Sequence, residues 1–195
     1  MQRIHTGCQS PIRFGGLHPS VPYPMQRHFG QDTETIMHKD HSKVLIIGGG
    51  TAGIDMAARM THHFSATEIT VIEPSEYHFY QPLWTLVGGG DARKEDSIRP
   101  QEDVMPDGVH WVRDFAETLI PTENAVLTRQ GLRIEYDVLI LAPGLKIDWG
   151  AISGLTEALR TDPRVSSNFD YNLSEKTFEA VKTFKGGKAL FTHPS

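Results

Sequence analysis

The sequence predicts an α/β fold organised around a parallel sheet. Three observations predict it: an apolar, β-branched run at 44–47, a glycine-rich turn that opens a helical segment, and a second apolar run at 69–72. Short apolar runs of this kind are typical of strands that a parallel sheet buries on both faces. Strand, helix and strand in this order form a βαβ unit.

The turn after the first strand carries the spacing Gly-x-Gly-x-x-Gly, with glycines at Gly48, Gly50 and Gly53. Gly48 permits the tight turn, Gly50 lets the backbone approach a pyrophosphate, and Gly53 lets the helix lie close to the strand. The helix, expected over 51–64, directs its N-terminus at the phosphates. Its small and apolar residues recur at helical spacing on one face: Ile54, Ala57, Ala58 and Thr61.

An acidic residue, Glu73, ends the second strand about twenty residues after Gly53. At this position a carboxylate accepts hydrogen bonds from both hydroxyls of an adenosine ribose and repels a 2′-phosphate. FAD or NAD is therefore favoured over NADP. The alternative is a glycine-rich turn in an ordinary α/β domain.

A further strand is expected at 136–141, ending in the small-residue turn Ala142-Pro143-Gly144. In flavoproteins with two dinucleotide domains such a strand, usually ending in Ala-Thr-Gly, returns the chain to the sheet beside the flavin pyrophosphate. Pro143 keeps the turn but removes a backbone N–H. The two motifs together favour FAD. A hairpin that turns at Gly131 is expected just before this strand.

Composition excludes several classes. The 195 residues are 22% charged and 38% hydrophobic, as in an ordinary globular domain. The net charge of −5 does not indicate the basic surface that binds nucleic acid. No apolar run approaches the roughly 18 residues that span a bilayer. Cys8 is the single cysteine, so we expect neither a disulfide framework nor a cysteine metal site within these residues.

Two segments lack a clear pattern of strand or helix. Residues 1–40 are proline-rich, and their first acid is Asp32. We expect a disordered leader that resembles a mitochondrial presequence, with a plain disordered extension as the alternative. The charged, proline-bounded segment 91–106 is expected to be a surface loop.

Between them, the segment Tyr77 to Trp84 is rich in aromatic and imidazole rings. Such rings could line the site of a buried, flat ligand. They could equally form a hydrophobic plug beneath the sheet. The sequence leaves both open.

Several segments resemble the mitochondrial-type sulfide:quinone oxidoreductases of the FAD-dependent pyridine nucleotide-disulfide oxidoreductase-like superfamily. The most specific is His78-Phe-Tyr-Gln-Pro-Leu-Trp-Thr-Leu-Val-Gly88, and Gly48–Ile54, Met56–Met60 and Glu73–Glu76 support it. Asn172–Phe178 and Lys188–Thr192 look like the family's helix and strand that enter a second dinucleotide domain, with Ser174 as a candidate helix N-cap. The resemblance covers about residues 41–195.

This resemblance implies an FAD enzyme that oxidises hydrogen sulfide through a cysteine persulfide and reduces ubiquinone at the inner mitochondrial membrane. It also implies a sulfur acceptor such as glutathione or sulfite. It implies a Rossmann-like FAD domain at 41–165, with a small β-hairpin insertion, and the start of a second domain at 166–195. The implied cofactor-binding residues are Gly48, Gly50, Thr51, Ala52 and Gly53 at the pyrophosphate, Glu73 at the ribose, Gln81 along the flavin, Ala116 at the adenine edge, and Gly144.

The family's redox cysteines, and the C-terminal region that the family uses for quinone and for peripheral membrane association, match no part of this sequence. We therefore assign no catalytic residue, and we expect this chain alone to be incomplete and inactive. Two alternatives remain: a flavoprotein that passes electrons from NADH to quinone, and a truncated, non-catalytic FAD-binding module.

Overall fold

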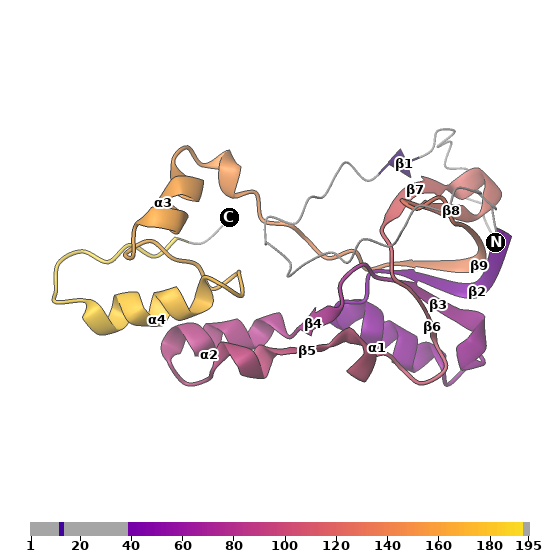
Figure 1. Ribbon diagram of the computed structural model, residues 1–195, viewed down its shortest axis with the longest axis horizontal. Helices are drawn as coiled ribbons and strands as arrows, with labels where there is room; N and C mark the ends of the chain where they lie inside the picture. Colours follow the sequence, from indigo (N-terminus) through magenta and orange to yellow (C-terminus); the bar gives the residue numbers. More distant parts are fainter. Residues whose placement is uncertain (1–11, 14–38, 193–195) are drawn as a thin grey trace, which may run out of the picture. The chain divides into compact units, whose positions relative to one another are not determined.

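The structure is a computed structural model that describes residues 12–13 and 39–192 (Figure 1). It forms two compact units. The first, the sheet unit, contains the chain up to His78 together with Pro100–Lys146, and the second, the helical unit, contains Phe79–Arg99 and the chain from Ile147. The predicted division at residue 165 stays a prediction.

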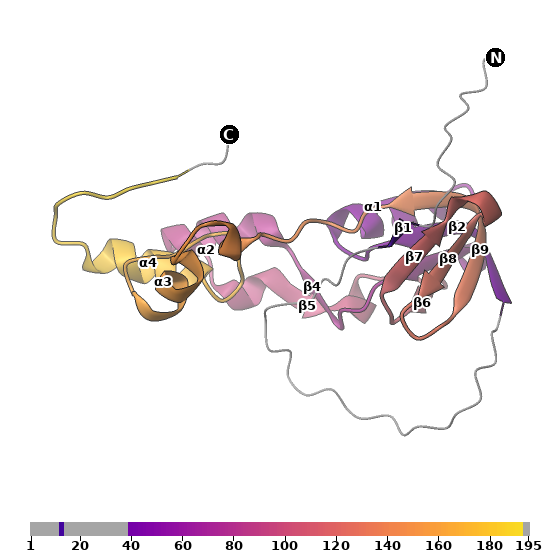
Figure 2. The ribbon, with the colours of Figure 1, turned by 90° about the horizontal axis from the view of Figure 1, so that it is seen from above.

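The sheet unit contains a seven-stranded sheet in the order β1-β7-β8-β9-β2-β3-β6 (Figures 1 and 2). Strands β9, β2, β3 and β6 are parallel, whereas β1, β7 and β8 are antiparallel to their neighbours. The predicted α/β fold with a parallel sheet is confirmed. The strands are β1 Ile12–Arg13, β2 Lys39–Ile47, β3 Ile69–Ile72, β6 His110–Val112, β7 Ala116–Ile120, β8 Ala125–Thr128 and β9 Arg133–Leu141.

The predicted βαβ unit is β2, helix α1 (Thr51–Met60) and β3, with Val44 opposite Ile69 in the parallel register. The helix ends at Met60 instead of 64. After it, His63 forms a turn hydrogen bond to the residue three positions earlier, from its N–H to the Met60 carbonyl (2.9 Å), instead of the four-position bond of an α-helix. The face of α1 also differs from the prediction. Ala57 is buried, but Ala58 is exposed.

Two apolar clusters hold the sheet, one on each face. The cluster under α1 also includes partly buried Met56 and Met60. Its buried members are Val44, Ile46, Ala57, Ile69 and Val71. The cluster on the opposite face contains Leu45, Ile47, Ile72, Val112, Leu119, Val126, Ile134 and Tyr136. Alternate residues of β2 thus enter opposite clusters, as the two-residue period of a strand buried on both faces requires.

The hairpin predicted at Gly131 is confirmed: Gly131 has φ of 90°, and its N–H donates to the Thr128 carbonyl at 3.1 Å. The strand predicted at 136–141 is confirmed, but it is not separate from the second strand of the hairpin. One continuous strand, β9, pairs antiparallel with β8 in its first half and parallel with β2 along its length. It is continuous because β2 begins at Lys39 and so offers backbone partners to the whole of β9.

Parts of the leader predicted at residues 1–40 form strands. Residues 39–40 belong to β2, and β1 pairs with β7 with Ile12 opposite Leu119. Its remaining residues, 1–11 and 14–38, lie outside the described ranges. Within those ranges, no helix is both long enough and apolar enough to cross a bilayer.

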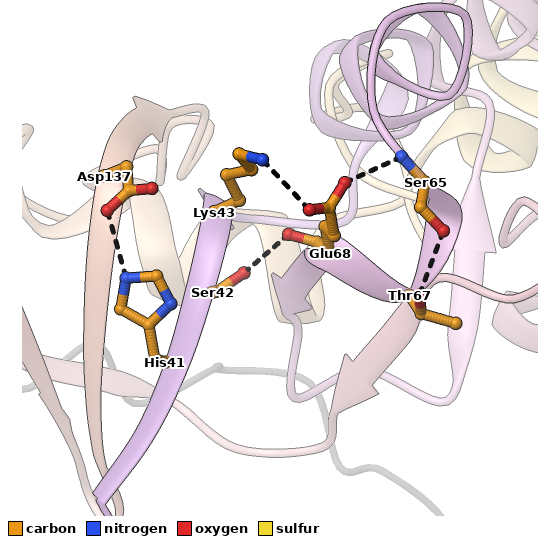
Figure 3. A network of polar contacts seen from close by, with 7 residues as sticks. All are labelled: His41, Ser42, Lys43, Ser65, Thr67, Glu68 and Asp137. Carbon is orange, nitrogen blue, oxygen red and sulfur yellow. Dashed lines mark hydrogen bonds and ion pairs between the residues drawn. The ribbon is translucent and has the colours of Figure 1, made fainter.

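Exposed ion pairs join the start of β2 to its neighbours (Figure 3). Lys43 Nζ lies 3.0 Å from Glu68 Oε1, and the Ser65 N–H donates to Glu68 Oε2 at 3.0 Å. His41 Nε2 lies 3.0 Å from Asp137 Oδ1 of β9. The Lys43 ammonium, and then the Ser65 N–H, lower the pKa of the Glu68 carboxyl below its ordinary value of 4.5.

The helical unit is built on α2 (Trp84–Gly89), α3 (Leu155–Thr161) and α4 (Ser174–Thr183) (Figure 2). The helix predicted after Ser174 is confirmed, but the N-cap is Leu173. Ser174 is instead a buried first residue whose Oγ donates to the Tyr171 carbonyl at 3.2 Å.

The strand expected at Lys188–Thr192 is not formed, and Leu190 and Phe191 are exposed. A strand needs a neighbour to accept and donate its ladder hydrogen bonds. No strand among the described residues of the helical unit runs beside this segment.

In the aromatic segment Tyr77 to Trp84, some rings are packed in a core and others are exposed. The ring centroid of Phe79 lies 6.3 Å from that of Trp84 and 5.3 Å from that of Tyr171, both in edge-on geometry. Trp84 is buried, and its Nε1 donates to Ser97 Oγ at 3.0 Å. These rings therefore form a packed aromatic core in the helical unit, whereas Tyr80 is half exposed.

Replacing Gly53 by alanine should destabilise the sheet unit. The new Cβ would lie 1.8 Å from the Gly48 carbonyl oxygen, which is a backbone atom that cannot rotate away. We expect Gly53→Ala to lower the free energy of unfolding by about 1–3 kcal/mol or more in urea melts. Gly50→Ala is the matched control, since its Cβ meets nothing within 4 Å. Equal stability of the two variants would contradict the close approach.

Replacing Glu68 by glutamine should make stability less dependent on pH. Because the folded-state pKa of Glu68 is lowered, its contribution is present above the ordinary value of 4.5 and is lost as pH falls through the folded-state pKa. Thermal melts should show a lower midpoint for Glu68→Gln at neutral pH and a shrinking gap in acid. Glu117→Gln, at an exposed acid of β7, is the control. A gap of constant size would refute the ion pair.

Candidate nucleotide-binding site

The glycine turn lies where three backbone segments meet at the carboxyl end of β2. Gly48 has φ of 100°, and its N–H donates to the Ile72 carbonyl at 2.9 Å. A Cβ on Gly48 would lie 2.1 Å from the Ala142 carbonyl oxygen. A Cβ on Gly53 would strike Gly48 itself. These contacts agree with the tight turn and the close helix expected from the motif.

Gly50 has a different environment. Its φ is −68°, and no protein atom lies within 4 Å of the place where its Cβ would be. It caps α1 without a side-chain hydrogen bond, and the first turn of the helix carries no acid. The N–H groups of Thr51, Ala52 and Gly53 have no acceptor within the helix, since every α-helix leaves its first donors unpaired. Such donors, with the helix dipole, favour an anion.

Glu73 lies beside this turn, and backbone groups already engage its carboxylate. Oε2 accepts from the Gly49 N–H at 2.7 Å, and Oε1 accepts from the Ser75 N–H at 2.7 Å. A carboxylate has about four acceptor positions. Glu73 can therefore keep both bonds and still accept from two further hydroxyls.

Gln101 was missed by the sequence reasoning. Its side chain is 1% exposed, and its Nε2 donates to the Gly49 carbonyl at 2.8 Å. His78 Nδ1 approaches the same carbonyl at 3.3 Å. The prediction of a surface loop at 91–106 is wrong at this residue. Gly49 is only an unspecified position of the glycine motif, and nothing in the charged segment around Gln101 signals that it lies inside.

The hollow next to Glu73 has a volume of about 300 Å³. Trp111 is one wall, and its Nε1 donates to the Glu73 carbonyl at 2.8 Å. The Arg113 guanidinium lies 4.1 Å from the centre of the Trp111 ring, a cation–π arrangement. The full lining is Glu76, Tyr77, Pro100, Glu102, Trp111 and Arg113.

Ala116 begins β7 after a turn that Asp114 holds. Asp114 is buried, and its carboxylate accepts from the N–H groups of Phe115 (2.7 Å) and Gln130 (2.9 Å). The turn leaves the carboxyl end of β6, next to Glu73, whose N–H donates to the Val112 carbonyl at 3.0 Å.

The turn at Gly144 closes the opposite side of the glycine motif. The Ala142 N–H donates to the Ile47 carbonyl at 2.8 Å, and Gly144 has φ of 70°. The sheet unit thus brings the glycine turn, Glu73 and the Ala142–Gly144 turn together at the carboxyl ends of β2, β3 and β9, where open α/β sheets bind their ligands. Gln81 is exposed in the helical unit, so its place in the site stays a prediction.

Comparison with known proteins agrees with this geometry. The family model for pyridine nucleotide-disulphide oxidoreductase matches residues 42–182. The chain belongs to that family. It is 42% identical to the mitochondrial sulfide:quinone oxidoreductase of Dictyostelium discoideum over 85% of this chain and 37% of that protein. It is likewise 42% identical to the mouse protein of the same name, over 88% of this chain and 37% of that protein.

Among solved structures, the sulfide:quinone oxidoreductase of Aquifex aeolicus matches with a TM-score of 0.57 and 26% identity, over 73% of this chain and 32% of that one. The resemblance inferred from the sequence is confirmed. The chain spans 37% of the length of the curated relatives described above.

Truncating Glu73 should destabilise the glycine turn even without nucleotide. Glu73→Ala removes the acceptor of two backbone N–H groups, so we expect the free energy of unfolding to fall by about 1–3 kcal/mol in urea melts. Glu117→Ala is the control, because Glu117 is an exposed acid. Wild-type stability of Glu73→Ala would show that the carboxylate does not hold the turn.

Proposed function

We propose that this chain is the FAD-binding part of a mitochondrial sulfide:quinone oxidoreductase. The observation that carries the proposal is the 42% identity to proteins of that name across most of this chain. The specific segment His78–Gly88 and the site at the end of β2 support it. Sulfide and ubiquinone are the proposed substrates, with glutathione or sulfite as the class of sulfur acceptor. The inner membrane is the proposed location.

The residues of the sheet unit fit FAD. The open position at Gly50 leaves room for a pyrophosphate, and the first N–H groups of α1 supply donors for it. The spare acceptor positions of Glu73 suit the ribose hydroxyls. We assign Gly48, Gly50, Thr51, Ala52 and Gly53 to the pyrophosphate, Glu73 to the ribose, Ala116 to the adenine edge, Gly144 to the pyrophosphate side and Gln81 to the flavin.

Bound FAD would supply two-electron acceptor chemistry. This chain's own contribution is to bind and orient the cofactor. Backbone donors at the start of α1 would hold the phosphates, and the Glu73 carboxylate would fix the adenosine end. Cys8 lies outside the described residues, and we assign no catalytic residue.

The proposal is tested on the protein isolated from its own cells. We expect bound FAD, loss of the flavin's visible absorbance on anaerobic addition of sulfide, and its return on addition of ubiquinone. Intact mass after thiol alkylation should show alkyl groups beyond the one that Cys8 can take. Bound FAD that sulfide does not reduce would favour a non-catalytic FAD module, and reduction by NADH alone would favour an NADH:quinone flavoprotein.

The assignment of the pyrophosphate has its own test. Gly50→Ala folds without a clash but places a methyl group where the phosphate should lie. We expect weaker FAD binding in fluorescence titrations with unchanged thermal stability of the FAD-free protein. Unchanged FAD affinity would show that the pyrophosphate does not bind next to Gly50.

A further inference from the structure

Gln101 is buried and held on three sides. It opens the short 3-10 helix η4 (Gln101–Asp103), its N–H donates to the Glu76 carbonyl at 2.9 Å, and its carbonyl accepts from the Met105 N–H at 3.1 Å. Its side-chain Nε2 donates to the Gly49 carbonyl at 2.8 Å, across 52 positions of the sequence. Burying an amide is costly unless it is hydrogen-bonded. The anchored backbone therefore presents the amide to Gly49 in a defined position.

The hydrogen bond sets the direction of one peptide group. The peptide between Gly49 and Gly50 is trans, so its C=O and N–H point in opposite directions. Because the Gly49 carbonyl points at Gln101, the Gly50 N–H points away from it. No described residue accepts a hydrogen bond from this N–H.

The preceding peptide is fixed as well, by a different residue. The Gly49 N–H donates to Glu73, and the Gly48 carbonyl of the same peptide points toward α1 at Gly53. A side chain at Gly49 has no room, since its Cβ would lie 2.7 Å from both Gln101 Nε2 and Glu73 Cγ. Gln101 and Glu73 thus enclose Gly49, each holding one of its two peptides.

We propose that Gln101 is a positioning residue for the FAD pyrophosphate: by holding the Gly49 carbonyl, it keeps the Gly50 N–H turned outward as a phosphate donor. This inference rests on the proposed function. Without the amide, His78 Nδ1 at 3.3 Å is the remaining side-chain partner of that carbonyl, and this longer contact restrains the rotation of the peptide less. A rotated peptide would present a carbonyl oxygen to the phosphate, which repels it.

Two variants of Gln101 separate positioning from packing. Gln101→Met keeps the length of the side chain but removes the donor, and we expect the Kd for FAD to rise about tenfold, as for the net loss of one hydrogen bond. Gln101→Glu can donate to the Gly49 carbonyl only when protonated. Its affinity for FAD should therefore recover, relative to the wild type, as pH is lowered.

The control is Thr128→Val in the β8–β9 hairpin. Thr128 is also 1% exposed, and its Oγ1 accepts from the Leu132 N–H at 3.1 Å. This variant loses a buried hydrogen bond away from the glycine turn, so it should lower thermal stability without changing the Kd for FAD. Fluorescence titration gives the Kd, and phosphorus NMR of bound FAD reports the surroundings of its two phosphates.

Weaker FAD binding and shifted phosphorus resonances in Gln101→Met, with neither change in Thr128→Val, would support the proposal. Wild-type affinity and resonances in Gln101→Met would overturn it while leaving the proposed function intact. Equal weakening in Thr128→Val would also overturn it, because general destabilisation would then be the cause. A wild-type chain that binds no FAD would overturn both proposals.

Discussion

The carboxyl end of the sheet depends on how closely three backbone segments approach one another at Gly48. The turn after β2, the start of α1 and the end of β9 meet there without an intervening side chain, since the Ala142 carbonyl occupies the place of a Gly48 Cβ and the Gly48 carbonyl that of a Gly53 Cβ. Separations this small align the ends of the strands. They also fix the direction of the first N–H groups of α1.

The two ends of β2 are stabilised by different physics. At its start, exposed ion pairs such as Lys43 with Glu68 join β2 to its surroundings, and exposed pairs contribute little to stability. At its end, Gly49 is held by a partly buried carboxylate and a buried amide. Hydrogen bonds shielded from water are costly to break. The end of β2 whose hydrogen bonds are shielded from water is therefore the end that carries the candidate site.

Local patterns predicted the features that local chemistry determines. The β2–α1–β3 unit, the turn at Gly131 and the helix after Leu173 follow from apolar runs, glycine and helical spacing. Features that depend on distant chain were missed. The full length of β9 depends on where β2 begins, and the burial of Gln101 depends on a carbonyl 52 positions away. The prediction of a strand at Lys188–Thr192 was wrong for the same reason, because a strand forms only where a neighbouring strand supplies its hydrogen-bond partners.

The close packing around the glycine turn means that most of its glycines do not by themselves indicate a bound nucleotide. Gly48, Gly49 and Gly53 are restricted by the chain's own atoms, so selection for folding alone would retain them even in a protein that had lost its ligand. Gly50 is the position among these four that the fold leaves unconstrained. In a homologue that no longer binds a nucleotide, we therefore expect substitution by a larger residue at the position of Gly50 first, with the other three glycines retained.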